Sequence, residues 1–98
     1  MGKILVHFTF PKLGAEVYEG VIKDLAAAGH GNIPERLYHV SAQHGNDWHV
    51  TDVWESEEAF NKFGETMVPI LVKNGGTPVP PVVMPVHNIL IPDRIRHL

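Results

Sequence analysis

The sequence predicts an α+β protein of the ferredoxin-like type, in which a four-stranded antiparallel sheet carries two helices on one face. The first observation is a hydrophobic period that switches between the two-residue repeat of strands and the 3.6-residue repeat of helices. The stretch 48–63, WHVTDVWESEEAFNKF, shows both, because residues 48–54 alternate and residues 59–63 recur on one helix face. The second is the predicted order of strand, helix, strand, strand, helix, strand, which is typical of the split βαβ architecture with spatial strand order 4-1-3-2.

The first third of the chain predicts one strand and one helix. Residues 3–10 alternate and are rich in β-branched and aromatic side chains, which predicts a strand that ends at Pro11. Residues 14–28 place apolar side chains on one face and charged ones on the other, which predicts an amphipathic helix closed by Gly29. Residues 30–36 contain two turn-forming residues and are expected to form a loop.

The middle of the chain predicts a hairpin that leads into a second helix. Residues 37–43 and 48–54 have strand character, and the turn formers at 45–47 join them. Ser56 is a good N-cap, and two glutamates follow it where their charges suit the positive end of the helix dipole. Pro69 lies inside this helix and lacks a backbone donor, so we expect a kink or a restart there.

The last quarter of the chain predicts an edge strand. Residues 74–76 end the helical region, and the proline-rich residues 77–81 are expected to form an extended connector. Residues 82–91 have strand character, although Pro85 lies among them. Because proline cannot donate to a ladder, this fourth strand must lie at an edge or contain a bulge. Pro92 is expected to stop it, leaving 93–98 as a short tail.

The composition is that of one soluble globular domain covering residues 1–98. The chain is 44% hydrophobic and 19% charged, and no apolar run approaches the roughly 20 residues that a membrane helix needs. The N-terminus lacks a signal-peptide pattern, so a cytoplasmic location without a membrane partner is expected. The absence of cysteine excludes disulfides and thiolate chemistry, and the net charge of −3 argues against a nucleic-acid partner.

The predicted architecture implies a partner for one face of the sheet. Two helices can cover only one face, so the other must be polar or be covered by another protein surface. The simplest partner is a second copy of the same chain. We therefore expect a homodimer.

The chain resembles a known group of small barrel proteins in residues spread over nearly its whole length. They are Tyr38-His39-Val40, Trp48, Val50, Asp52-Val53-Trp54-Glu55-Ser56, Phe60, Phe63, Pro69 and Pro85-Val86-His87-Asn88. In these positions the chain is similar to the dimeric α+β barrel proteins of the antibiotic biosynthesis monooxygenase-like group. The resemblance implies two protomers packed sheet against sheet and a pocket for a small, often aromatic, ligand. Characterised members of that group include oxygenases that use no metal or flavin, isomerases, haem-degrading enzymes and proteins without a known reaction. The resemblance to the oxygenases implies that no cofactor is needed.

Asp52 is the first candidate for chemistry, because it interrupts an apolar strand face between Val50 and Trp54. Burying a carboxylate without partners is costly, so such a residue either has a function or has found donors. It is a candidate general base at the back of a pocket between sheet and helices. The alternative, which we favour on sequence grounds, is that it caps backbone amides at the start of the second helix.

Histidines are the second group of candidates. Strand alternation places His7 on the face away from the helices. If the hairpin has an even register, His39 and His49 lie on that face as well, and the side chains that point toward the helices include Tyr38, Val40 and Ala42. Three histidines on one face are a candidate divalent-metal site, but without a metal-binding spacing they are better interpreted as lining a dimer interface, and no metal site is predicted.

These observations lead to one predicted site and three functions that it could serve. The candidate bases are Asp52, His39 and His87, and the candidate substrate-binding residues are Tyr38, Trp48, Trp54 and Asn88. The leading hypothesis is a homodimer that binds a small apolar or aromatic molecule and oxidises it without a cofactor. The alternatives are a non-catalytic ligand-binding or structural dimer, and an isomerase or cyclase in the same pocket. A cavity of about 300 Å³ beside Asp52 would favour a ligand-binding function.

Overall fold

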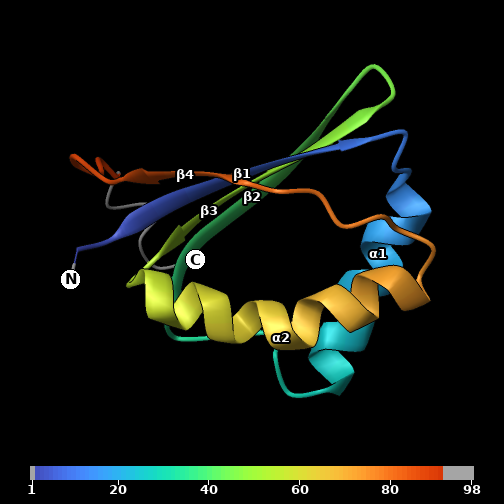
Figure 1. Cartoon of the computed structure of the whole chain (residues 1–98), viewed down its shortest axis with the longest axis horizontal. Coiled ribbons are helices and arrows are strands. Elements are labelled where there is room, and N and C mark those ends of the chain that lie inside the picture. Colours follow the sequence, from blue (N-terminus) through green and yellow to red (C-terminus); the bar gives the residue numbers. More distant parts are fainter. Residues whose placement is uncertain (1, 92–98) are drawn as a thin grey trace.

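The computed structural model describes residues 2–91 and shows one sheet packed on two helices (Figure 1). The elements follow the predicted order. They are β1 (Ile4–Pro11), α1 (Ala15–Ala27), β2 (Arg36–His44), β3 (Asp47–Trp54), α2 (Glu57–Lys73) and β4 (Val82–Pro85).

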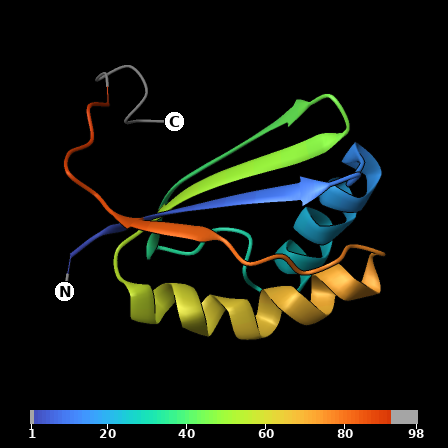
Figure 2. The same cartoon turned by 45° about the horizontal axis from the view of Figure 1, so that its top comes forward.

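The sheet has the predicted topology. Its spatial order is β2-β3-β1-β4, and every pair of neighbours is antiparallel. Both helices lie on the same face of the sheet, as the two views show (Figures 1 and 2). The ferredoxin-like α+β fold is therefore confirmed, with β4 at an edge. No helix within residues 2–91 is long and apolar enough to cross a membrane.

The core lies between the sheet and the helices, and strand alternation explains its composition. In β1 the residues that point toward the helices are buried, namely Ile4, Val6, Phe8 and Phe10. They pack against apolar side chains of both helices, including Leu25, Phe63 and Leu71. Burial of this apolar area is the main force that holds the helices on the sheet.

Helix α2 begins at its predicted cap but differs from expectation in its middle. The Ser56 side chain accepts a hydrogen bond from the Ala59 amide at 3.1 Å. The helix then continues through Pro69 as one element, so of the two outcomes expected there, a kink or a restart, the restart does not occur. The donor that Pro69 lacks would have bonded the carbonyl of Glu65, and both residues are exposed, so water can satisfy that carbonyl.

Strand β4 is shorter than predicted. It ends at Pro85 rather than at residue 91, and one further backbone bond, from the Val86 amide to the Lys3 carbonyl at 3.0 Å, follows it. The shortening agrees with the missing donor of Pro85. Pro92, which was expected to stop this strand, and the tail 93–98 lie outside the described residues.

The register of the hairpin differs from the assumed one. His44 pairs with Asp47, so Gly45 and Asn46 form a two-residue turn, with Gly45 at φ 60. This turn pairs His39 with Asp52, which is an odd register. The prediction for β2 was therefore wrong: His39 and Ser41 face the helices, whereas Tyr38, Val40 and Ala42 point to the other side.

We call that other side the open face. It is formed by Leu5, His7 and Thr9 of β1, by the residues paired with them in β3 and β4, and by the residues of β2 paired with that β3 row. The paired residues include His49, Thr51, Val53, Val82, Met84, Tyr38 and Val40. Several of its apolar side chains are exposed: Tyr38 is 43%, Val40 45% and Met84 45% exposed.

Candidate functional site

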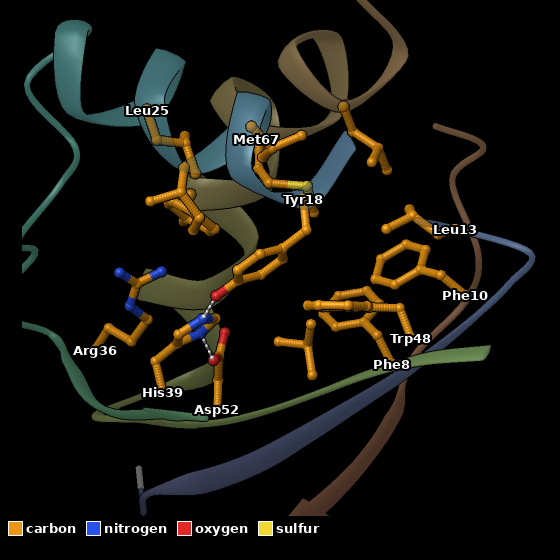
Figure 3. A pocket seen from close by; sticks show the side chains of 15 residues that line it. Phe8, Phe10, Leu13, Tyr18, Leu25, Arg36, His39, Trp48, Asp52 and Met67 are labelled. Carbon is orange, nitrogen blue, oxygen red and sulfur yellow. Dashed lines mark hydrogen bonds and ion pairs between the residues drawn. The ribbon is translucent and has the colours of Figure 1, made fainter. Parts of the chain in front are cut away.

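A cavity lies between the sheet and the helices, lined by side chains from both layers (Figure 3). Its walls are mostly apolar and aromatic, with Phe8, Trp48 and Val50 from the strands and Tyr18, Phe63 and Met67 from the helices. Three polar side chains join them: His39, Asp52 and Arg36. An apolar chamber with a few convergent polar groups is the usual form of a small-molecule site.

The cavity is small in the single chain. The centres of water molecules can occupy about 60 Å³ of it, within about 530 Å³ of empty space that also includes its open mouth. The smaller volume is the one available to a bound molecule, and it has room for about four waters. A cavity beside Asp52 thus exists where the sequence predicted one, with less room than the expected 300 Å³.

A chain of hydrogen bonds crosses one wall of the cavity. Tyr18 extends from α1 and its hydroxyl lies 2.6 Å from His39 Nε2, while His39 Nδ1 lies 2.5 Å from Asp52 Oδ1 (Figure 3). The other carboxylate oxygen accepts from Trp54 Nε1 at 3.3 Å. When Nδ1–H donates to the carboxylate, Nε2 is left with a lone pair directed at the Tyr18 hydroxyl.

Asp52 has the position of a residue that orients a base. It is 3% exposed, and its carboxylate is hydrogen-bonded to His39 and Trp54, whereas the cap of α2 is Ser56. The capping role that we favoured from sequence is therefore not the one observed. A carboxylate that fixes the tautomer of a histidine, which in turn contacts a hydroxyl, is a recurring arrangement for proton abstraction.

Trp48 contributes an unused donor to the cavity wall. Its ring packs against Tyr18 at a centroid distance of 5.0 Å, and its Nε1 is buried without a hydrogen-bond partner. Most buried donors in proteins are paired with protein or water. This donor therefore suits an acceptor oxygen, supplied by water or by a ligand.

Tyr18 and Arg36 are site residues that sequence reasoning missed. Tyr18 looked like one more apolar position on a helix face, and Arg36 lay in an expected loop. Arg36 instead begins β2 and places its guanidinium over the Phe63 ring, 5.6 Å from the centroid. The odd hairpin register would have been the signal, because it turns His39 toward the helix that carries Tyr18.

The predicted site residues divide between two places. Asp52, His39 and Trp48 line the cavity, and Trp54 is fully buried behind Asp52. His87, Asn88 and Tyr38 instead line a separate groove on the open face. His87 is thus remote from Asp52, and the two do not act in one chamber.

Histidines on the open face form a smaller group than predicted. His7 and His49 lie side by side there, but His39 belongs to the cavity. Within residues 2–91, no three or more His, Asp or Glu side chains gather as ligands for a metal ion.

Solved structures with the same architecture come from monooxygenases. A candidate antibiotic biosynthesis monooxygenase from Caulobacter crescentus matches 91% of this chain and 92% of its own, with a TM-score of 0.60 and 20% identity. A monooxygenase of Streptomyces coelicolor in complex with the ligand nanaomycin D matches 94% of this chain and 93% of its own, with a TM-score of 0.57 and 20% identity.

The chain has the antibiotic biosynthesis monooxygenase-like fold. The predicted resemblance is thus confirmed for the architecture, which is all that 20% identity establishes. No family model matches the sequence, and no curated protein matches it.

Proposed function

We propose that this protein binds a small aromatic molecule in the cavity and oxidises it with molecular oxygen, without a cofactor. The Tyr18–His39–Asp52 chain carries this proposal, because it gives a largely apolar chamber a base with a fixed tautomer. Support also comes from the monooxygenase-like fold, one example of which holds the ligand nanaomycin D.

In the proposed reaction, His39 Nε2 removes an acidic proton from a phenol or from a carbon next to a carbonyl. Tyr18 lies on the path, so its hydroxyl passes its own proton to Nε2 and takes the proton of the substrate. Asp52 stabilises the imidazolium that results. The electron-rich carbanion or phenolate then reacts with oxygen, which places one oxygen atom in the product as a carbonyl and releases the other as water.

Two further side chains suit the charge that develops on the substrate. The free Trp48 Nε1–H is a donor for a carbonyl or phenolate oxygen. Arg36 supplies the positive charge among the lining residues. Fixed donors aimed at developing negative charge are a major source of catalysis in a site that excludes water.

Binding an aromatic molecule requires the cavity to widen. Its present free volume suits a few waters, so at least one lining side chain must move. Met67 is the best suited, since its unbranched side chain has three rotatable bonds and adapts to irregular space.

We further propose that the protein is a homodimer joined through the open face. Exposed apolar side chains gather there, with Tyr38, Val40, Val82 and Met84 between 43% and 57% exposed. Contiguous apolar area of this kind usually marks an interface. A soluble, cytoplasmic protein remains our expectation for its location.

The test is oxygen consumption by the metal-stripped protein with anthrones, hydroquinones and catechols as substrates. We expect the wild type to consume oxygen, with the rate falling about 10²-fold or more in His39→Gln and in Asp52→Asn. His87→Ala is the matched control, since His87 lines the groove on the open face, and it should retain the rate.

Other outcomes would favour the alternatives. A substrate that raises the melting temperature without consuming oxygen would indicate a binding protein. Conversion of that substrate to an isomer, lost in His39→Gln, would indicate an isomerase or cyclase that uses the same base. A rate that His39→Gln leaves intact would exclude the proposed base.

A separate prediction concerns Trp48. Trp48→Phe keeps an aromatic ring beside Tyr18 and removes the unused donor together with the five-membered ring of the indole. We expect ligand affinity to fall about tenfold, the equivalent of one hydrogen bond of about 1.4 kcal/mol, while the free protein loses only the packing of the deleted ring atoms, about 1 kcal/mol. Isothermal titration calorimetry and urea unfolding measure the two effects, and equal affinity in both proteins would show that the ligand does not use this donor.

A further inference from the structure

Two histidines and two threonines form a polar cluster on the open face, away from the proposed active site. His7 and Thr9 belong to β1, and the residues paired with them in β3 are Thr51 and His49. Their side chains therefore share one face of the sheet, opposite the cavity. In the single chain the cluster is accessible from one side, since Thr9 is exposed and the other three residues are partly buried.

Three atoms of this cluster form a nearly equilateral triangle. His7 Nε2 lies 3.2 Å from His49 Nδ1, and Thr9 Oγ1 lies 3.4 Å from the first nitrogen and 3.5 Å from the second. Ligands that surround a tetrahedral ion at the usual Zn–N distance of about 2.0–2.1 Å lie about 3.3 Å from one another. The triangle thus has the size of one face of a metal coordination tetrahedron.

The remaining contact of His7 suits the same function. Its Nδ1 lies 2.8 Å from Thr51 Oγ1. In the tautomer that donates Nδ1–H to Thr51, the Nε2 lone pair points into the triangle. Metal-binding histidines usually donate their second ring nitrogen in this way, which fixes both tautomer and ring orientation.

We propose that His7 Nε2 and His49 Nδ1 bind a divalent transition-metal ion such as Zn²⁺. Thr9 Oγ1 completes the triangle as a neutral oxygen ligand, and water takes the open position. Imidazole is a good ligand for Zn²⁺, Ni²⁺ and Cu²⁺ and a poor one for Mg²⁺ and Ca²⁺, so the site selects the first group. The ion replaces the proton that the two rings otherwise share, and His49 then carries its proton on Nε2.

This site is independent of the proposed oxidation. No cluster residue lines the cavity, and the reaction proposed for the cavity uses no metal. The test therefore measures binding rather than activity, and either proposal can fail without the other.

The experiment is calorimetric titration of the full, tag-free chain with Zn²⁺ at neutral pH. We expect saturable binding of at most one ion per chain, weakened at least about tenfold in His7→Ala and in His49→Ala. His30→Ala is the matched control, because His30 follows α1 and its ring lies near Phe63 rather than near the cluster. It should bind as the wild type does.

Thr51→Val provides a second, milder variant that leaves both ligands in place. Loss of a supporting hydrogen bond typically weakens metal binding about 10- to 100-fold, so we expect a loss in this range with the fold intact by circular dichroism. Mg²⁺ should not bind. The proposal is overturned if millimolar Zn²⁺ produces no binding heat, or if His7→Ala and His49→Ala bind as tightly as His30→Ala.

Discussion

At the scale of single residues, the Asp52 carboxylate is the buried charged group around which the hydrogen bonds of the site are arranged. At 3% exposure it needs donors, and it has two in the side chains of His39 and Trp54. The sequence indicated that Asp52 is unusual, because a charged residue interrupts an apolar alternation. It did not indicate the partner, because a shift of one residue in the hairpin register moves His39 from one face to the other.

Removing this carboxylate should destabilise the protein. Asp52→Ala leaves the buried Trp54 Nε1 and the partly buried His39 Nδ1 without an acceptor, and an orphaned buried group costs about 1–3 kcal/mol. We expect the free energy of unfolding to fall by about 2–4 kcal/mol in urea titrations. Asp47→Asn, at the turn end of the same strand, is the control and should change it by less than about 0.5 kcal/mol. An equally stable Asp52→Ala protein would mean that water replaces the carboxylate.

At the scale of elements, the predictions succeeded where the residue type alone determines the local structure. They failed where the structure depends on solvent access or on the length of a turn. Ser56 caps α2 as its residue type predicts. Pro69 did not restart the helix, because its cost depends on whether the freed carbonyl reaches water, which only the tertiary structure determines. Tyr18 contacts the site because the two-residue turn after His44 sets a register that directs His39 toward α1. Arg36 lies beyond an irregularity between Arg36 and Tyr38 and pairs with Trp54, so this turn alone does not determine its side.

The two helices are joined near their C-terminal ends by Asn74 and Asp24. The Asn74 Nδ2 donates to the Asp24 carboxylate at 3.0 Å, and also to the Ile70 carbonyl at 2.9 Å. The hydrogen bond from Asn74, followed by the charge of Lys73, lowers the pKa of Asp24 below its usual value of 3.8. Because the folded-state pKa is the lower one, this contact stabilises the protein above pH 3.8, and the stabilisation is lost as the pH falls through the folded value.

Asn74→Ala tests this contact. The variant should return the pKa of Asp24 toward 3.8, as followed by NMR titration of its carboxyl carbon. Its stability relative to the wild type should be lower at neutral pH, and the difference should shrink as the pH falls below 3.8. Asp24→Asn serves as the control, since it abolishes the titration. A difference that stays constant with pH would assign the effect to the Ile70 contact instead.

At the scale of the whole molecule, one sheet covered on a single face leaves an apolar surface that needs an explanation. The open face carries Val40 at 45% exposure, in the same cross-strand row as Thr51, His7 and Val82. The sequence predicted such a surface, because two helices can cover only one face of the sheet. It did not predict which residues form the surface, because that depends on the strand register. Tyr38 and Val40 were expected in the core and are found on this face instead.

The proposed dimer predicts that a charge on the open face separates the protomers. Val40→Lys would bury an unpaired ammonium in the interface, at a cost of several kcal/mol, so the dissociation constant should rise about 100-fold or more. Val72→Lys is the matched control, because Val72 is 53% exposed on α2, away from the open face. Sedimentation equilibrium should give a dimer for the wild type and for Val72→Lys and a monomer for Val40→Lys at micromolar concentration. A wild-type monomer, or a Val40→Lys dimer, would show that copies of this chain do not pair through this face, and the apolar surface would then require a different partner.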